Sequence, residues 1–270
     1  MRLATVTTPG GSTAAAWRDG WRRLPASDLS AYLRVHTTAD AHALAGDDVS
    51  DAVPTLLLPS PGKVICCGLN YGDHIAETGR ERPTYPTLFA KFADTLIGPD
   101  DTIDLPADVE TDWEAELAVV VGAELRNATQ TEAQAGIAGY TIANDISIRD
   151  WQRRTLQWFQ GKAWDATTPL GPVLVTPDEI DPKDGVEVVC RVNGIERQRG
   201  NTRTLVFDCP ALLSYISTFT TLRPGDVVLT GTPGGVGMAM DPPTYLTGGD
   251  TVETEIDGIG MLTNHIRTGA

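Results

Sequence analysis

Long apolar runs are absent from this chain of 270 residues. No stretch approaches the roughly 20 apolar residues that a membrane-spanning helix needs. The opening residues, MRLATVTTPGG, also lack the apolar core of a signal peptide. We therefore expect a cytoplasmic protein with no membrane partner.

Positive charge is scarce as well. Lys and Arg together number 21 against 36 for Asp and Glu, which gives a formal net charge of −15 at pH 7. A surface of this sign repels a phosphate backbone, so nucleic acid is not an expected partner.

Cysteine is rare, with four residues in the chain. Cys66 and Cys67 are adjacent, Cys190 and Cys209 stand alone, and none has the spacing of a zinc site or a redox motif. Because free cysteine usually behaves as a small buried hydrophobe, we expect reduced core thiols.

The chain divides into two parts of different texture. Residues 1–57 contain a short strand pattern and two brief helical patterns, the first with Ser27 as a plausible N-cap, and they predict a small N-terminal appendage. Residues 58–270 consist mainly of short apolar runs separated by Gly, Pro, Asn and Asp. This spacing predicts a strand-rich domain of the mixed α+β class, with one clear helix at 210–219.

Two tight turns are explicit in the sequence. Asn193-Gly194 and Asp257-Gly258 each lie between apolar runs. These dipeptides favour the positive φ angles of a hairpin turn, so each predicts a pair of antiparallel strands.

Two glutamates interrupt the apolar stretch DWEAELAVVVG at 112–122. On a strand Glu114 and Glu116 point to the same side, where two like charges repel unless something neutralises them. A divalent cation would do so, and Asp145, at the end of the apolar run 137–145, offers a third oxygen donor. Three carboxylates leave part of the coordination shell of Mg²⁺ or Mn²⁺ open to a substrate. The alternative is an edge strand whose glutamates face water.

Three further segments carry candidate functional groups. On a helix His74 and Glu77 would face each other, and a carboxylate beside an imidazole fixes the tautomer of a general base; a surface ion pair is the alternative. Lys162 could stabilise developing negative charge or be a solvated lysine. The glycine-rich segment 224–237 lacks the P-loop and dinucleotide patterns, but its amides and the hydroxyls of Thr230 or Thr232 could hold a carboxylate.

Taken in order, these segments resemble the fumarylacetoacetate hydrolase family. The similarity spans roughly residues 59–266 and rests on five ordered motifs: NYxxHxxE at 70–77, ExE at 114–116, NDxSxRDxQ at 144–152, GK at 161–162 and PGDVxxTGTPxGVG at 224–237. The resemblance implies a rolled, flattened β-sheet fold, usually a homodimer, with Mg²⁺ or Mn²⁺ in the active site.

The resemblance also implies roles for the matching positions. These are metal ligands at Glu114, Glu116 and Asp145, a general-base dyad at His74 and Glu77, an enolate-stabilising Lys162, and substrate contacts at Arg149, Gln152 and Thr232. Two departures concern the far end of the substrate. The chain has Ala163 and Trp164 after GK, where many members have Ser and Phe, and Gly234 where Ser is frequent. With Trp151, Trp158 and Phe159 nearby, they predict an altered pocket wall.

A metal chelated by a 2-oxo acid makes enolate formation easier, and several reactions pass through an enolate. Our leading expectation is hydrolysis of a C–C bond in an acylpyruvate-like diketo acid of aromatic catabolism, with His74 and Glu77 activating water. The alternative is an isomerase or decarboxylase acting on a 2-hydroxymuconate-type diacid or on oxaloacetate. A catalytically silent ligand-binding protein is the third possibility.

Overall fold

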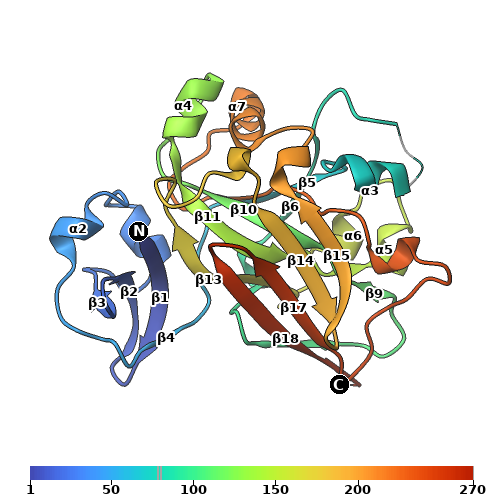
Figure 1. Cartoon of the computed structure of the whole chain (residues 1–270), viewed down its shortest axis with the longest axis horizontal. Coiled ribbons are helices and arrows are strands. Elements are labelled where there is room, and N and C mark those ends of the chain that lie inside the picture. The colour runs from blue at the N-terminus through green and yellow to red at the C-terminus, as the bar shows by residue number, and fades with distance from the viewer. Residues whose placement is uncertain (78, 80, 270) are drawn as a thin grey trace.

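A computed structural model describes residues 1–77, 79 and 81–269; residues 78, 80 and 270 lie outside the described residues. Two β-sheets dominate it (Figure 1), which confirms the mixed, strand-rich class. The larger sheet has the strand order β3 (Trp21–Arg23), β2 (Gly11–Trp17), β1 (Arg2–Thr8), β13 (Thr168–Val175), β11 (Ile137–Asn144), β10 (Ala115–Val121), β16 (Val227–Leu229), β5 (Val64–Gly68) and β6 (Thr87–Lys91), with β4 (Val53–Pro54) beside β1 and β7 (Leu96–Ile97) beside β13.

The second sheet lies across the central strands of the first. Its order is β15 (Ile195–Asn201), β14 (Glu187–Val192), β17 (Thr251–Ile256), β18 (Gly260–Thr268) and β8 (Thr102–Leu105). Strands β14 and β17 contact β10 and β11, so the two sheets pack face to face. A short third pair joins β12 (Ser147–Ile148) to β9 (Thr111–Asp112).

Helices are few and short. They are α1 (Leu29–Leu33), α2 (Ala41–Leu44), α3 (Gly72–Glu77), α4 (Gln130–Ala135), α5 (Arg149–Gln152), α6 (Phe159–Lys162) and α7 (Cys209–Phe219), with single 3₁₀ turns at Ala93–Thr95, Pro182–Asp184, Thr202–Thr204 and Gly237–Ala239. The helix predicted at 210–219 is α7, which Asp208 caps by accepting a hydrogen bond from the amide of Ala211. Within the described residues, no helix has the length and apolar character to cross a membrane.

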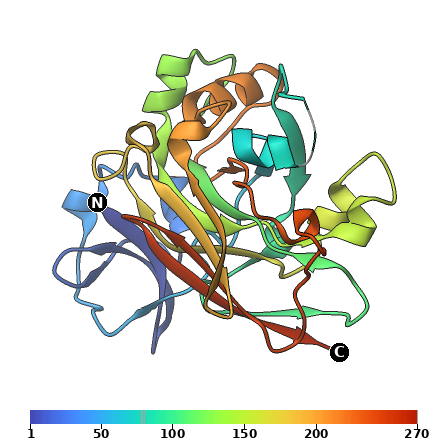
Figure 2. The same ribbon diagram turned by 45° about the vertical axis from the view of Figure 1, so that its right-hand side comes forward.

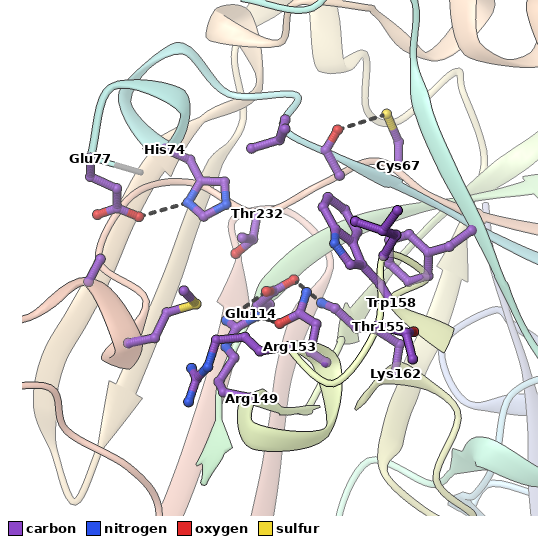
Figure 3. Close-up of a pocket in the computed structure, with 17 residues that line it drawn as sticks. Cys67, His74, Glu77, Glu114, Arg149, Arg153, Thr155, Trp158, Lys162 and Thr232 are labelled. Carbon is purple, nitrogen blue, oxygen red and sulfur yellow. Dashed lines mark hydrogen bonds and ion pairs between the residues drawn. The ribbon is translucent and has the colours of Figure 1, made fainter. Parts of the chain in front are cut away.

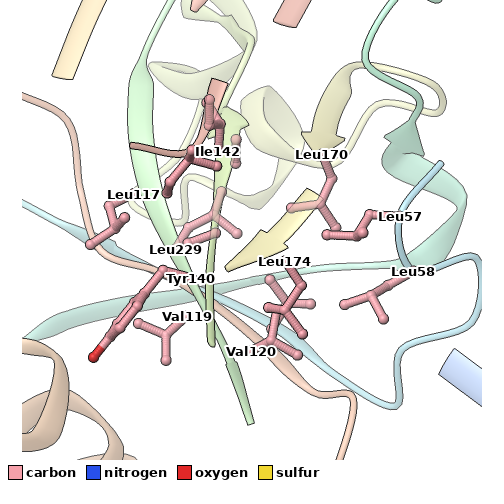
Figure 4. Packing of buried hydrophobic residues seen from close by; sticks show 14 of the residues in the cluster. Leu57, Leu58, Leu117, Val119, Val120, Tyr140, Ile142, Leu170, Leu174 and Leu229 are labelled. Carbon is pink, nitrogen blue, oxygen red and sulfur yellow. The ribbon is translucent and has the colours of Figure 1, made fainter. Parts of the chain in front are cut away.

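The central strands carry no alternation of apolar and polar residues because they are buried on both faces. Every residue of β10 and β11 is buried. Figure 4 shows Leu117, Val119 and Tyr140 on one side of these strands and Val120 on the other side, next to Leu174 of β13. All four cysteines are free and buried, as predicted.

Both predicted hairpins form. Asn193 and Gly194 join β14 to β15 with φ angles of 54° and 74°. Between β17 and β18 the turn extends over residues 257–259, and of its two predicted residues Gly258 has the positive φ, 79°. This turn therefore has three residues between the paired Ile256 and Gly260.

The N-terminal segment continues the larger sheet. Strand β1 pairs with β13, with Leu3 opposite Leu174, so the first residues extend the sheet edge at the left of Figure 1. The predicted N-cap at Ser27 is wrong: Asp28 caps α1 through the amide of Ala31 at 2.8 Å, and Ser27 donates to the Asp28 carboxylate. A domain boundary near residue 57 stays a prediction.

Candidate active site

A cavity of about 570 Å³ is lined by residues of α3, α5 and α6 and of the neighbouring strands β5 and β6 (Figure 3). The ribbon of these three helices can be followed by its colour in Figure 2. The walls of the cavity contain every predicted site residue except Glu116 and Asp145, which are buried close to Glu114. The lining residues include His74, Glu77, Phe89, Glu114, Arg149, Gln152, Trp158, Lys162, Thr232 and Met238.

Strand register brings the three predicted carboxylates together. Ala115 of β10 lies opposite Asn144 of β11, so Glu114 and Asp145 flank this pair, and the amide of Asp145 donates to the carbonyl of Glu114 at 2.8 Å. One carboxylate oxygen from each of Glu114, Glu116 and Asp145 lies within 4.8 Å of the others, and all three residues are buried. The edge-strand alternative is wrong, because β10 lies between β11 and β16.

Three buried cations surround the carboxylates. The Lys162 ammonium lies 2.6 Å from Glu114 Oε2 and 2.7 Å from Asp145 Oδ2. Arg149 contacts Glu114 Oε1 at 2.7 Å, and Lys91 contacts Asp145 Oδ1 at 2.7 Å. Lys162 is therefore not the solvated lysine of the alternative interpretation. Lys91 was not predicted from the sequence, where its one signal is a charge near the end of the apolar run TLFAKF.

The cations affect the pKa values of the two glutamates differently, because Lys162 and Arg149 contact Glu114. Burial raises the pKa of Glu114, but Lys162 and Arg149 outweigh burial and lower it to about 2. Burial, together with the charges of Asp145 and Glu114, holds the pKa of Glu116 well above its ordinary value. The amide of Gly231 donates a hydrogen bond to Glu116 Oε2 at 2.6 Å.

The donor set fits a divalent cation. Asp145 Oδ1 is buried, and its ion pair with Lys91 at 2.7 Å leaves a second lone pair of this oxygen for another ligand. Glu116 forms no ion pair with a described cation. Two buried carboxylates with unused acceptor capacity, next to a third, form the all-oxygen environment that Mg²⁺ and Mn²⁺ prefer.

The dyad lies on α3, at the opposite side of the cavity from Lys162 (Figure 3). His74 Nδ1 lies 2.7 Å from Glu77 Oε1, and the His74 ring is buried, so the pair is not a surface ion pair. The orientation leaves Nε2 on the side of the ring that faces the cavity.

The glycine-rich segment holds the dyad in place. The amide of Gly235 donates to Glu77 Oε2 at 2.8 Å, and the amide of Gly234 donates to Asp73 at 3.2 Å. The segment therefore does bind carboxylates, as the sequence suggested, but these carboxylates belong to the protein. Gly235 has φ 97°, a conformation that side chains other than glycine rarely adopt.

The predicted substrate contacts are fixed by neighbouring groups. Arg149 donates to Asp112 at 2.7 Å and to Gln152 at 2.9 Å. Asp112, which the sequence analysis did not select, also accepts from the amides of Gly237 and Met238. These contacts tie α5 to the end of the glycine-rich segment.

Thr232 lines the cavity, but its hydroxyl is already bonded. It donates to the carbonyl of Ala115 at 2.9 Å and accepts from the Gln198 amide at 2.8 Å. The hydroxyl of Thr230 likewise donates to the carbonyl of Leu117. Both hydroxyls are thus tied to β10, and the predicted role of Thr232 as a substrate contact rests on its position in the wall.

An aromatic wall adjoins Lys162. The Phe89 ring lies 5.8 Å from the Trp158 ring, edge to face, and 5.2 Å from the Lys162 ammonium. A Cβ atom on Gly68 would lie 2.4 Å from Trp158, so the indole ring fits here only because residue 68 has no side chain. Of the three aromatic residues named for this wall, Trp158 lines the cavity, and Trp151 and Phe159 are not among its described lining residues; an altered wall stays a prediction.

Comparison with known proteins identifies the family. Residues 63–267 match the family described as fumarylacetoacetate (FAA) hydrolase, C-terminal. The chain is 45% identical over 217 residues to the oxaloacetate tautomerase FAHD2A, mitochondrial, of Bos taurus, covering 78% of this chain and 69% of that protein. This chain belongs to the fumarylacetoacetate hydrolase family.

Solved structures agree with this assignment. A 5-carboxymethyl-2-hydroxymuconate delta-isomerase from Mycobacterium smegmatis superposes with a TM-score of 0.82 at 35% identity, over 100% of both chains. A fumarylpyruvate hydrolase from Pseudomonas aeruginosa, in complex with Mn²⁺ and pyruvate, has a TM-score of 0.71 at 29% identity, covering 79% of this chain and 92% of its own. The chain is thus an enzyme of a superfamily whose named members include tautomerases, isomerases and hydrolases.

Proposed function

We propose that this enzyme binds one Mg²⁺ or Mn²⁺ at Glu114, Glu116 and Asp145 and interconverts the enol and keto forms of a 2-oxo acid. The observation that carries the proposal is the placement of two kinds of group on opposite walls of one cavity. A carboxylate cluster with Lys162 lies on one wall, and His74, oriented by Glu77, lies on the other.

The bound ion would supply Lewis-acid polarisation of the substrate carbonyl. Burial lowers the pKa of Lys162, but Asp145 and Glu114 outweigh burial and raise it, so the ammonium stays charged beside the developing enolate oxygen. His74 Nε2 would move the proton at the carbon next to that carbonyl, while Glu77 fixes the tautomer. The Gly235 amide holds the carboxylate of Glu77 and therefore positions the base.

The comparisons support tautomerisation more than the hydrolysis that we expected first. The Bos taurus relative is named an oxaloacetate tautomerase, and its sequence is more similar to this chain than that of the fumarylpyruvate hydrolase. Hydrolysis of an acylpyruvate stays the second candidate. The cavity of about 570 Å³ favours it, because this volume exceeds the needs of a four-carbon acid.

An absorbance assay separates the two reactions. Metal-loaded protein is mixed with the enol form of oxaloacetate, with acetylpyruvate and with fumarylpyruvate, each with and without EDTA. Tautomerisation predicts EDTA-sensitive decay of the enol with no pyruvate formed. Loss of the diketone absorbance with release of pyruvate would establish hydrolysis instead. No EDTA-sensitive turnover of any of the three acids would contradict the proposed function.

Assembly is a separate question. The homodimer expected from the family resemblance stays a prediction, as does the cytoplasmic location. Light scattering of the purified chain would test the first: a mass twice the 28.9 kDa of one chain supports a dimer, and a mass of one chain refutes it.

A further inference from the structure

Asp145 is held by two lysines that differ in their access to the cavity. Lys162 contacts Asp145 Oδ2 and lines the cavity. Lys91 contacts Asp145 Oδ1 and is not among the described residues that line the cavity. The Lys91 side chain is fully buried at the end of strand β6 and donates to Thr168 Oγ1 at 2.8 Å. Lys91 is therefore placed to act on Asp145 and not on substrate.

The buried charges show what this second lysine changes. Four carboxylates, Asp112, Glu114, Glu116 and Asp145, form one cluster with three cations, Lys91, Lys162 and Arg149. With every group ionised the cluster carries one net negative charge, and a divalent ion would make it one net positive charge. Without Lys91 the loaded cluster would be neutral. Lys91 thus supplies the excess positive charge that attracts an anionic substrate.

We propose that Lys91 is a positioning residue that fixes Asp145, weakens metal binding and strengthens binding of the anionic substrate. This inference rests on the proposed metal site. An ion bound by Asp145 would lie close to the Lys91 ammonium, because that ammonium is 2.7 Å from Oδ1. Like charges repel strongly at such distances in a buried site, so Lys91 opposes the metal and favours the acid.

The test compares Lys91→Met with the wild-type chain. Titration calorimetry measures the Kd of Mn²⁺, and then the Kd of pyruvate at saturating Mn²⁺. We expect the variant to bind Mn²⁺ at least ~10-fold more tightly and pyruvate at least ~10-fold more weakly. The Tm of the metal-free variant should fall, because Asp145 loses a buried partner, and Mn²⁺ should raise it more than in the wild type.

Matched variants separate charge from anchoring. Thr168→Val removes the hydrogen bond to Lys91 but keeps its charge, so both Kd values should stay within ~3-fold of wild type. Lys63→Met removes a lysine that pairs with Asp226 at 3.2 Å, outside the carboxylate cluster, and should leave both values unchanged. If Lys91→Met does not fold, Lys91→Gln, which can still donate to Thr168, tests the same expectation.

The outcomes distinguish this inference from the proposed function. A wild-type chain that binds no Mn²⁺ overturns both. A wild-type chain that binds Mn²⁺, with Lys91 variants whose Kd values lie within ~3-fold of it, overturns the role of Lys91 alone. Weaker Mn²⁺ binding in those variants also overturns it, because orientation of Asp145 would then outweigh repulsion.

Discussion

Asp112 offers a sharp test of how the cavity is held together. Its fully buried carboxylate accepts hydrogen bonds from Arg149 at 2.7 Å and from the amides of Gly237 and Met238 at 2.7 and 3.0 Å. Asp112→Asn keeps the shape but removes the charge and turns one acceptor into a donor. The new NH₂ group must then face either Arg149 and Met238 or the Gly237 amide, all of which are donors.

The size of the stability loss in Asp112→Asn follows from the burial of the Asp112 carboxylate. A charge-assisted hydrogen bond contributes about 1.5–3 kcal/mol, and removing one partner of a buried ion pair costs about 3–5 kcal/mol. Because Glu114 still pairs with Arg149, we expect a loss of about 3 kcal/mol in the free energy of unfolding, near the lower limit. For a chain of this size that loss corresponds to a fall in Tm of about 6–12 °C.

Differential scanning calorimetry checks the expectation. The matched control is Asp104→Asn, which breaks an exposed ion pair with Arg267 and should shift the Tm by less than ~2 °C. Catalytic turnover of Asp112→Asn should also fall, because Arg149 and the glycine-rich segment lose their common anchor. An Asp112→Asn variant that melts within ~2 °C of wild type would refute this account of the network.

Three further predictions concern the candidate site. Because the pKa of Glu116 is raised, metal binding must displace its proton, so Mn²⁺ affinity should rise with pH, and calorimetry in buffers of different ionisation enthalpy would detect the released proton. The metal-free fold, in contrast, should lose stability as pH rises through that raised pKa. His74→Gln should lower turnover ~100-fold or more while leaving the Kd of Mn²⁺ within ~3-fold, and equal losses in both would contradict its role as a base. Trp158→Ala should raise KM for a 2-oxo acid with an apolar tail more than for oxaloacetate, and equal changes would remove Trp158 from the substrate wall.

Much of the strand content could be predicted, because buried strands appear as short apolar runs between turn residues. The runs at 116–122 and 137–145 became β10 and β11 with nearly the same bounds. Strand β15 could be predicted only from the Asn193-Gly194 turn before it, because its own sequence, IERQRGN, is mostly polar, as in a loop. It pairs with β14 directly across that turn, with Val192 opposite Ile195. The strand order of the sheets also depends on contacts that no local pattern encodes.

The candidate site shows a similar division. Glu114, Glu116 and Asp145 could be selected because carboxylates interrupt or end apolar runs. Lys91 and Asp112 could not, since each is one charged residue whose partner is brought to it by the fold from a distant segment. The sequence also indicated that the glycine-rich segment could hold a carboxylate, but Glu77 of α3 became its partner only through tertiary packing.

The most direct test of the central claim is electron paramagnetic resonance of Mn²⁺ bound to the purified chain, titrated with pyruvate labelled with ¹⁷O on its keto and carboxylate oxygens. The account predicts one bound Mn²⁺ per chain, line broadening by both labelled positions, and loss of the bound signal in Glu116→Ala. A wild-type chain that binds no Mn²⁺, or a Glu116→Ala variant that binds it equally well, would contradict the proposed metal centre.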